Sequence, residues 1–548
     1  MEHDRLPATP EGIGPPDRHE TSGIQGRPEV SGHRLGILSI FVAGLLILAL
    51  AGCATRLPTN VQRTPSVAFE RFETTSTGQL FEESANRHPG KSGFALIRKG
   101  RPAFTGRIAM TAMAEKSLDL QYYIWEADTT GRILALRLVE AADRGVRVRL
   151  LVDDNNIAGR DSPIASLDAH PNIEIRIFNP FAHRGSRLFG YMTDFVRLNH
   201  RMHNKAIIAD NAFAIVGGRN IGNHYFGVHT DANFRDLDIA AAGPVVRELS
   251  TVFDRFWNGD WSYPIAALVD RKYTEVDLRS TVAATRELIR QDDYPYPLDQ
   301  DVEELMGQLD KIRDGFIWAP GMVVWDDPAS IKKGIEESTM SKALHRKIYT
   351  LEKELLIESA YFVVLDRGVR AAKNLHEKGV RVRVLTNSLA SNDVVAAHAG
   401  YAKRRKQLVE NGVELYEMRP DSKSATVREK RIFTVGKSKA ALHTKAIVFD
   451  RKAVFVGSYN LDPRSAAINT EMGLYVESAE MARQVIAYMD EGVLPYNSYR
   501  VELDEKGKLV WNTQKDGQPV RYTREPESTF WQRFMSGFIK MLPVEIHL

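Results

Sequence analysis

The alternation of hydrophobic and polar positions repeats one pattern in two places along the chain. Short runs of aliphatic and β-branched residues flank an amphipathic segment, and a glycine that suits a helix C-terminus stands before each second run. The first copy covers 117–125, 131–144 and 145–153, and the second covers 354–362, 366–378 and 379–386. Each copy predicts a strand, a helix and a second strand, which together form a βαβ unit.

A polar motif occurs twice, late in each half of the chain. The first copy is His203-x-Lys205-x4-Asp210 followed by Gly217-x-x-Asn220. The matching residues of the second copy are His443, Lys445, Asp450, Gly457 and Asn460. The separation from His to Gly is 14 residues in both copies (217 − 203 and 457 − 443), and that from His to Asn is 17. A duplication of this size predicts two α/β lobes related by a pseudo-twofold axis, with one site between them.

The residues around each motif alternate as in a strand, a turn and a returning strand. Because residues i and i+2 of a strand share a face, His203 and Lys205 should point the same way. Asp210 falls where a hairpin turn is expected, and Gly217 ends the return strand and lets the backbone bring Asn220 towards the lysine. The second copy predicts the same arrangement.

The residue types of the doubled motif suit phosphodiester cleavage without a metal. One imidazole can attack phosphorus while the other protonates the leaving alkoxide, and the two then exchange roles. Lys205 and Lys445 supply positive charge, and the amides of Asn220 and Asn460 can donate to the equatorial oxygens. Because the pattern lacks a carboxylate-rich metal site, we expect neither a metal nor another cofactor.

A nucleophilic imidazole needs an acceptor on its second nitrogen to hold the correct tautomer. In the second half this acceptor is expected to be Glu471, 11 residues after Asn460 (471 − 460). In the first half either Asp236 or Asp238 could serve, and we favour Asp236. The aspartates of the motif, Asp210 and Asp450, are interpreted as residues that stabilise the turn or pair with a neighbouring base, since Asp is common in turns.

The N-terminal region carries the second strong signal. No charged residue occurs from 35 to 55, and the run is almost wholly apolar, as in a signal peptide or a short membrane anchor. It contains Leu50-Ala51-Gly52-Cys53, which resembles a bacterial lipoprotein cleavage box and makes Cys53, the single cysteine, a candidate lipidation site. An uncleaved anchor is the alternative. We expect residues 1–53 to be a disordered leader with this segment, and the rest of the chain to lie on the periplasmic side of the cell membrane.

The composition pattern divides the remaining chain. We predict a linker over 54–75, the first lobe over 76–262, a connecting or site-covering segment over 263–345 and the second lobe over 346–500. Residues 501–548 are predicted to form a C-terminal hairpin and an amphipathic helix. The apolar residues of this helix could lie at a lipid interface or dock on the protein core.

The doubled HxKxxxxD motif with GxxN resembles the phospholipase D superfamily. The longer runs RMHNKAIIADNAFAIVGGRNIGNHYFG, YYIWEAD, LLVDDNN, RIFNPF and DLDIAAAGPVV look more narrowly like the bacterial cardiolipin synthase C group, from about residue 75 onwards. The resemblance implies an α/β fold of two phospholipase D-like lobes, each a mixed β-sheet flanked by helices, with one shared active site. It also implies a phosphohistidine mechanism and the following active-site residues: His203, Lys205, Asp210, His443, Lys445 and Asp450.

These observations favour a membrane-tethered phosphatidyltransferase that makes cardiolipin from phospholipids, with phosphatidylglycerol as the acceptor. Hydrolysis of phospholipids to phosphatidic acid is the first alternative, because the motif is the same when water is the acceptor. A phosphodiesterase or nuclease, or a lipid-binding protein without activity, is less favoured. A net charge of only +3 produces no strong field for nucleic acid, so we expect no nucleic-acid partner. Protein partners are left open.

Overall fold

The computed structural model describes residues 57–292, 294–296, 307, 310–333, 338–424 and 439–542. The predicted leader, the apolar run over 35–55 and Cys53 lie outside the described residues. Within the described part, no helix is both long and apolar enough to cross a bilayer.

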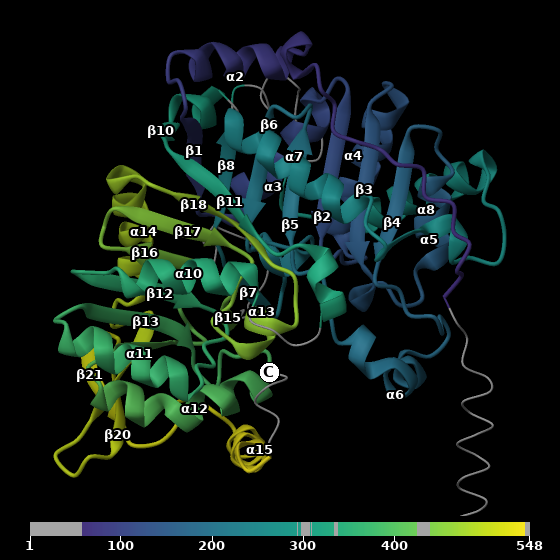
Figure 1. Cartoon of the computed structure of the whole chain (residues 1–548). Coiled ribbons are helices and arrows are strands. Elements are labelled where there is room, and N and C mark those ends of the chain that lie inside the picture. The colour runs from purple at the N-terminus through teal and green to yellow at the C-terminus, as the bar shows by residue number, and fades with distance from the viewer. Residues whose placement is uncertain are drawn as a thin grey trace, which may run out of the picture. The chain divides into compact units, whose positions relative to one another are not determined.

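The first lobe is built on a mixed sheet of nine strands in the order β10-β1-β8-β6-β5-β2-β3-β4-β9 (Figure 1). Strands β2, β3 and β4 are parallel, and their other neighbours are antiparallel. The strands are β1 (Ser92–Ile97), β2 (Ser117–Tyr122), β3 (Arg147–Asp153), β4 (Ile173–Phe178), β5 (Lys205–Ala209), β6 (Phe213–Gly217), β8 (Asp238–Ala242), β9 (Ser262–Pro264) and β10 (Ile317–Ala319).

The helices of the first lobe are α2 (Ser76–Asn86), α3 (Gly100–Met113), α4 (Thr129–Asp143), α5 (Asp161–Asp168), α6 (Arg187–Leu198), α7 (Pro244–Trp257) and α8 (Glu275–Gln291). Helix α4 connects the parallel strands β2 and β3, so the first predicted βαβ unit is confirmed.

The second lobe repeats the central part of this order in a ten-stranded sheet, β11-β18-β17-β16-β12-β13-β14-β19-β20-β21. The strands are β11 (Gly321–Trp325), β12 (Glu354–Ser359), β13 (Arg381–Asn387), β14 (Glu414–Met418), β16 (Lys445–Phe449), β17 (Ala453–Gly457), β18 (Met472–Val476), β19 (Ser498–Leu503), β20 (Leu509–Lys515) and β21 (Gln518–Tyr522). The helices are α10 (Thr339–Tyr349), α11 (Asp366–Glu377), α12 (Val395–Glu410), α13 (Pro463–Ala467), α14 (Ala479–Gly492) and α15 (Phe530–Lys540). The parallel pair β12 and β13 with α11 confirms the second βαβ unit.

Both predicted hairpins are present. Strands β5 and β6 turn at Asp210 and Asn211, and β16 and β17 turn at Asp450 and Arg451. All four turn residues have φ between 49° and 58°, the left-handed region that two-residue hairpin turns require and that Asp and Asn tolerate better than most side chains.

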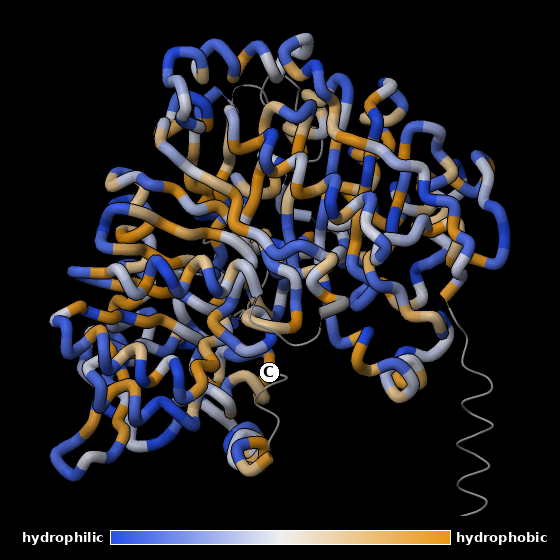
Figure 2. The backbone as a smooth tube through the Cα atoms, viewed as in Figure 1, coloured by the Kyte–Doolittle hydropathy of each residue, from blue (hydrophilic) through white to orange (hydrophobic). Residues whose placement is uncertain are grey.

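A single hydrophobic core joins the lobes. Its buried side chains come from β6 and β8 of the first sheet, from β16, β17 and β18 of the second, and from the helices α7 and α14. Figure 2 shows hydrophobic stretches along the strands of both sheets. Removing this shared apolar surface from water holds the two motif-bearing hairpins in fixed relation.

Two strands from the segment predicted to connect the lobes, β10 and β11, are part of the two large sheets. Strand β10 pairs with β1 at one edge of the first sheet, and β11 pairs with β18 in the second. Beyond residue 500 the predicted hairpin, β20 and β21, extends the second sheet through β19. A third, two-stranded sheet of β7 (Ala232–Arg235) and β15 (Lys439–Leu442) crosses from one lobe to the other.

Candidate active site

Each motif histidine is positioned by the backbone of the opposite lobe. The backbone N–H of His203 donates to the carbonyl of Thr470 at 2.8 Å, and that of His443 donates to the carbonyl of Arg235 at 2.8 Å. Thr470 precedes Glu471 and Arg235 precedes Asp236. The same exchange of main-chain bonds in both directions therefore carries each carboxylate to the other lobe's histidine.

The two carboxylates bind the histidines crosswise. Nδ1 of His203 lies 2.8 Å from Oε2 of Glu471, and Nδ1 of His443 lies 2.6 Å from Oδ2 of Asp236. The expected carboxylates are present, but the expectation that each serves its own half is wrong. The pairing of β7 with β15 brings Asp236 beside His443, and a separate bridge between Met202 and Thr470 brings Glu471 beside His203. Asp238, the alternative to Asp236, instead accepts from Arg107 at 3.0 Å.

This pairing fixes the chemistry of the imidazoles. When Nδ1–H donates to a carboxylate, the lone pair of the ring lies on Nε2, where it can act as a nucleophile or base. Burial, with help from Lys205 and Lys445, holds the pKa of His203 well below its usual range. Burial and Lys445 lower the pKa of His443 to about 4. Both rings are therefore neutral at pH 7.

The motif lysines are buried beside the histidines. The ammonium of Lys205 donates to the backbone carbonyl of His203, and that of Lys445 donates to the carbonyl of His443. Burial lowers the pKa of Lys205 well below its usual value, while Glu471 opposes this shift and Lys445 reinforces it. Because groups from both copies act on one another's pKa, the two motifs form one electrostatic site.

The two carboxylates carry different protonation tendencies. Burial raises the pKa of Glu471 to about 7, against the opposing charge of Lys205. Burial would also raise the pKa of Asp236, but His443 and the nearby cations hold it below its usual value. Ser458 donates a short hydrogen bond of 2.5 Å to Glu471.

The motif aspartates bind backbone rather than the histidines. Asp210 accepts from the N–H groups of Lys116 at 2.8 Å and Ser117 at 2.9 Å, and Asp450 accepts from Lys353 at 2.8 Å and Glu354 at 3.0 Å. Both lie at the far end of the motif strand from the lysine. This geometry agrees with the interpretation of these residues as turn-stabilising.

The two asparagines are placed differently. Asn220 accepts from the N–H of Ile124 at 3.1 Å and donates to Tyr225 at 3.0 Å, so its amide is already held by protein groups. The side-chain oxygen of Asn460 is buried without a hydrogen-bond partner in the described protein. The expected role of both amides as hydrogen-bond donors to the phosphate oxygens stays a prediction.

Three aromatic side chains that the sequence analysis did not single out line the histidines. The ring of Tyr123 lies 5.0 Å from that of His203, and those of Tyr225 and Phe234 lie 5.1 and 5.2 Å from that of His443. Tyr123 directly follows β2, whose last residue pairs with Lys205. That register is the sequence signal that could have identified Tyr123.

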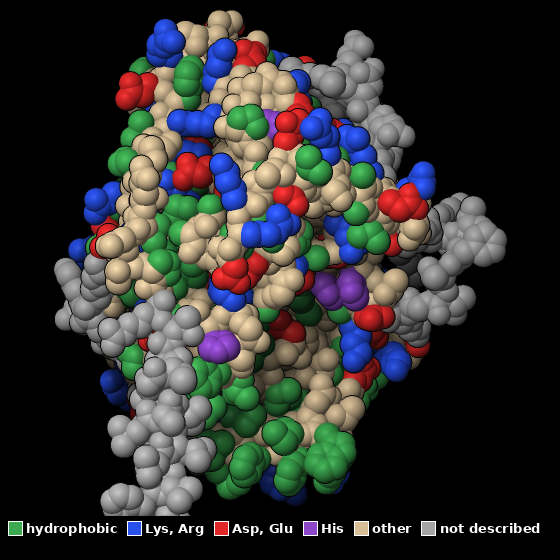
Figure 3. Space-filling view, turned by 90° about the vertical axis from the view of Figure 1, so that its right-hand side faces the viewer, with side chains coloured by type: hydrophobic (Ala, Val, Ile, Leu, Met, Phe, Trp, Pro, Cys, Tyr) green, Lys and Arg blue, Asp and Glu red, His purple; other side chains and the backbone are tan. Residues whose placement is uncertain are grey.

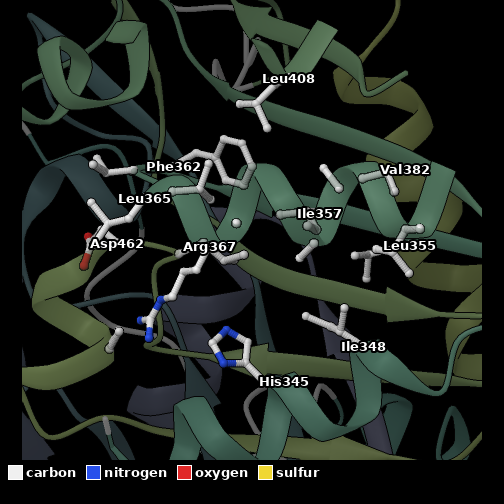
Figure 4. Close-up of a pocket in the computed structure, with 18 of the residues that line it drawn as sticks. His345, Ile348, Leu355, Ile357, Phe362, Leu365, Arg367, Val382, Leu408 and Asp462 are labelled. Atoms are coloured by element: carbon white, nitrogen blue, oxygen red, sulfur yellow. The ribbon is translucent and has the colours of Figure 1, made fainter. Parts of the chain in front are cut away.

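A separate apolar cavity of about 530 Å³ lies in the second lobe between α10 and α11 (Figure 4). Phe362 and Leu365 line it together with the basic residues His345 and Arg367. The motif histidines and lysines are absent from its lining. It is therefore a different feature from the paired histidines.

The chain matches known proteins along most of its length. The family described as "Cardiolipin synthase, PLD-like domain" matches residues 108–257 and 344–492, which together are more than half of the chain. Cardiolipin synthase C of Escherichia coli (strain K12) is 39% identical over 476 residues, covering 84% of this chain and 97% of that protein. An uncharacterized protein of Helicobacter pylori (strain ATCC 700392 / 26695) is 29% identical over 508 residues, covering 92% of this chain and 99% of that protein.

The fold is also found in a solved structure. The crystal structure of phosphatidylserine synthase from Haemophilus influenzae Rd KW20 superimposes with a TM-score of 0.53 at 14% identity, covering 85% of this chain and 100% of that one. The doubled mixed sheet with its two motifs defines a phospholipase D-like protein. The chain belongs to the cardiolipin synthase, phospholipase D-like family, and it is a cardiolipin synthase-like enzyme.

Proposed function

We propose that the protein is a membrane-tethered phosphatidyltransferase that makes cardiolipin from phospholipids through a covalent phosphohistidine. The observation that carries this proposal is the crossed pair His203–Glu471 and His443–Asp236, with both motif lysines buried beside it. The similarity to cardiolipin synthase C of Escherichia coli supports the choice of lipid substrates.

The geometry supports a two-step displacement. In the first step Nε2 of one histidine attacks phosphorus, the bond from phosphorus to the leaving alcohol oxygen breaks, and the other histidine gives that oxygen a proton. In the second step the acceptor alcohol attacks the phosphohistidine and gives its proton to the second histidine, and the first imidazole leaves. Lys205 and Lys445 stabilise the charge on the non-bridging oxygens, and each carboxylate stabilises an imidazolium when it forms.

The acceptor is proposed to be phosphatidylglycerol, whose free hydroxyl groups can attack the intermediate. Water attacking the same intermediate would give phosphatidic acid, so hydrolysis is the main competing reaction. The two differ in the acceptor alone, because both use the same phosphohistidine.

Location at the cell membrane is proposed from the apolar run over 35–55, with Cys53 as the lipidated residue and the lobes on the periplasmic side. Cys53→Ser should change the processing of the protein and lower the fraction of it that is recovered with the membranes. Unchanged processing and extraction would favour an uncleaved anchor.

Mass spectrometry of the lipids tests the reaction. The full chain is incubated with vesicles of isotopically labelled phosphatidylglycerol, alone and with a second phospholipid as donor, and His203→Ala is the control. Cardiolipin that carries label from two lipids is expected, in EDTA as well as without it, because histidines and lysines supply the required groups. Phosphatidic acid as the sole product would show a hydrolase instead of a transferase. Activity that is lost in EDTA and restored by a divalent cation would contradict the metal-independent mechanism.

A further inference from the structure

Two helices expose apolar faces to solvent. In α15 the exposed large residues are Phe530, Trp531, Phe534, Met535 and Phe538, with Met541 just beyond the helix. In α6 they are Leu188, Met192, Phe195 and Val196. Trp531 is 68% exposed and Val196 is 80% exposed. Each of the two short helices therefore carries several large apolar side chains together rather than a scattered single residue.

Helix α15 is oriented opposite to an ordinary surface helix. Its inner residues are Gln532, Ser536 and Lys540, spaced four apart on one face, and Ile539 beside them is also half-buried. Ser536 is buried, the amide of Gln532 donates to the carbonyl of Leu389 at 3.3 Å, and burial lowers the pKa of Lys540. A surface helix normally buries its apolar stripe and exposes its polar one. Here the polar side contacts the protein and the aromatic side faces outward.

Helix α6 buries Gly190 and Leu198 but also leaves large apolar side chains exposed. Its small residue Gly190 lies inward, where an added Cβ would come within 2.7 Å of the ring of Phe181. Tyr191 is anchored by a hydrogen bond of 3.0 Å to Asn155. Leu188, Met192, Phe195 and Val196, which are spaced about one and two turns apart, are exposed to solvent.

Helix α6 leads directly towards one motif histidine, and helix α15 contacts a loop that is hydrogen-bonded next to the other. Helix α6 runs into Asn199, four residues before His203, and Arg464 of the other lobe donates to the Asn199 side chain at 2.8 Å. Helix α15 is bound to Leu389, in the loop after β13. In the same region Asn387 exchanges two hydrogen bonds of 2.8 Å with Leu442, the residue before His443.

The figures place these helices at one edge. Both α6 and α15 lie along the lower edge of Figure 1. Figure 3 shows hydrophobic side chains gathered at the lower end of the face that is turned towards the viewer.

We propose that α6 and α15 together form a docking surface that lies on a phospholipid bilayer, so that the shared histidine site faces the lipid headgroups. This inference rests on the proposed function, which gives the protein a reason to contact lipids. The exposed faces of the two helices indicate where that contact is made. Trp and Phe side chains suit the boundary between headgroups and acyl chains. Arg533, exposed in the same helix, provides a cation for lipid phosphates. Docking would bring both halves of the site towards the membrane, since α6 leads into the segment before His203 and α15 contacts the loop that is hydrogen-bonded to Leu442, the residue before His443.

A single-cysteine fluorescence experiment tests the surface in the full chain. Cys53→Ser removes the only cysteine, and Val196→Cys or Trp531→Cys then provides one position for a polarity-sensitive dye. Val276→Cys is the matched control, because Val276 is 70% exposed but lies on α8. The vesicles contain phosphatidylglycerol and phosphatidylethanolamine, with or without lipids that carry a nitroxide quencher in the acyl chain.

Dyes at positions 196 and 531 should be quenched several-fold more than the dye at 276. Quenching that is equal at all three positions, or absent at 196 or 531, would overturn the proposal. This readout needs no turnover, so it decides the docking surface even if the proposed reaction fails.

A kinetic experiment separates docking from chemistry. The double variant Val196→Glu with Phe534→Glu should lose activity several-fold on vesicles and keep it on a short-chain phosphatidylglycerol dissolved as monomers, because exposed substitutions of this kind leave the fold intact. Val276→Glu should retain both activities. An equal loss on both substrates, or no loss on vesicles, would contradict a membrane-docking role.

Discussion

The two lobes share the order of their central strands but hold their carboxylates differently. The first lobe has Gly218 at the position where the second has Ser458, in the sequences GGRN and GSYN. A Cβ at Gly218 would come within 2.1 Å of Asp236, whereas the hydroxyl of Ser458 donates to Glu471. A short acid beside glycine and a longer acid beside serine are therefore two ways to fill the same place.

This difference has an electrostatic consequence. The short acid, Asp236, keeps a pKa below its usual value through His443, while burial raises the pKa of Glu471 to about 7. A duplicated site is thus not a symmetric one. Its two histidines experience unequal support when they become positively charged.

The lobes also differ in the packing of their helices. Leu134, three residues after Gly131, is fully buried in the core of the first lobe, where α3 packs on α4. The matching residue, three after Gly368, is Ala371, which lines the cavity of about 530 Å³. Losing the volume of one leucine side chain at this position is one physical reason for the opening between α10 and α11.

The largest effect should come from removing either histidine. His203→Ala and His443→Ala should each lower the transfer rate by at least ~10³-fold, because nucleophile and acid are both required. His376→Ala, an exposed histidine on α11, is the control and should keep its activity. Near wild-type turnover in either site variant would contradict the requirement for both histidines.

Replacing the carboxylates should sharpen the comparison between the two halves of the site. Asp236→Asn removes a charged partner and should reduce kcat by ~10²-fold or more, while Glu471→Gln, at a position of raised pKa, should cost nearer ~10-fold. Steady-state kinetics at pH 7 with the same vesicles measures both. Equal losses, or the reverse order, would show that the unequal pKa values do not govern catalysis.

The helix packing predicts a difference in stability. Leu134→Ala should lower the free energy of unfolding by about 2–5 kcal/mol, since it opens a cavity in a filled core. Ala371→Leu should change it by less than about 1 kcal/mol, because the added side chain enters space that is already empty. Denaturant titrations monitored by circular dichroism measure the free energy of unfolding of each variant. A large loss in Ala371→Leu would mean that the cavity cannot accept the leucine.

The pH dependence of stability should differ between the two carboxylates. Glu471 ordinarily titrates near 4.5 and has a folded pKa of about 7. The folded state therefore binds more protons between these values, and the stability contributed by Glu471 is complete below pH 4.5 and lost as the pH rises through 7. The advantage of wild type over Glu471→Gln should fall by about 3 kcal/mol across this window.

Asp236→Asn is the control for this titration. Its folded pKa lies below the usual value, so its contribution is lost only as the pH falls through the acidic range and should be flat from pH 4.5 to 7. A flat Glu471→Gln difference over the same window would contradict the assignment.

The smallest effect is expected at the motif aspartates. Asp210 is fully buried, so Asp210→Ala should cost about 1–3 kcal/mol by leaving buried N–H groups without acceptors. Asp450 is partly exposed, and water can replace its carboxylate, so Asp450→Ala should cost less. Thermal melting gives the ranking, with kcat of the folded variants as the control. A loss of kcat comparable to that of His203→Ala would assign these aspartates a chemical role.

Much of the fold could be predicted because its signals are local. The hydrophobic runs of β2 and β12, the glycines after α4 and α11, and the hairpin turns at Asp210 and Asp450 each depend on neighbouring residues. Strands β10 and β11 could not be found this way, since they are three and five residues long and pair with strands far away in the sequence.

The side chains that meet at the candidate site could be proposed from the sequence, but their pairing could not. Asp236 and Glu471 could be proposed from the need for an acceptor, yet the choice of histidine depends on how the lobes dock. The direction of the α15 apolar face has the same limit. Spacing shows that Phe530, Phe534 and Phe538 share a side of the helix, but not whether that side faces the protein or the solvent.

The crossed carboxylates also determine when the enzyme can first work. His203 and Glu471 are separated by 268 residues, and His443 and Asp236 by 207. Contacts between such distant residues form late in folding, after the cost of closing long loops has been met. A nascent first lobe therefore carries an imidazole without its acceptor. Both histidines can therefore have their acceptors only after the second lobe has been made and has docked on the first.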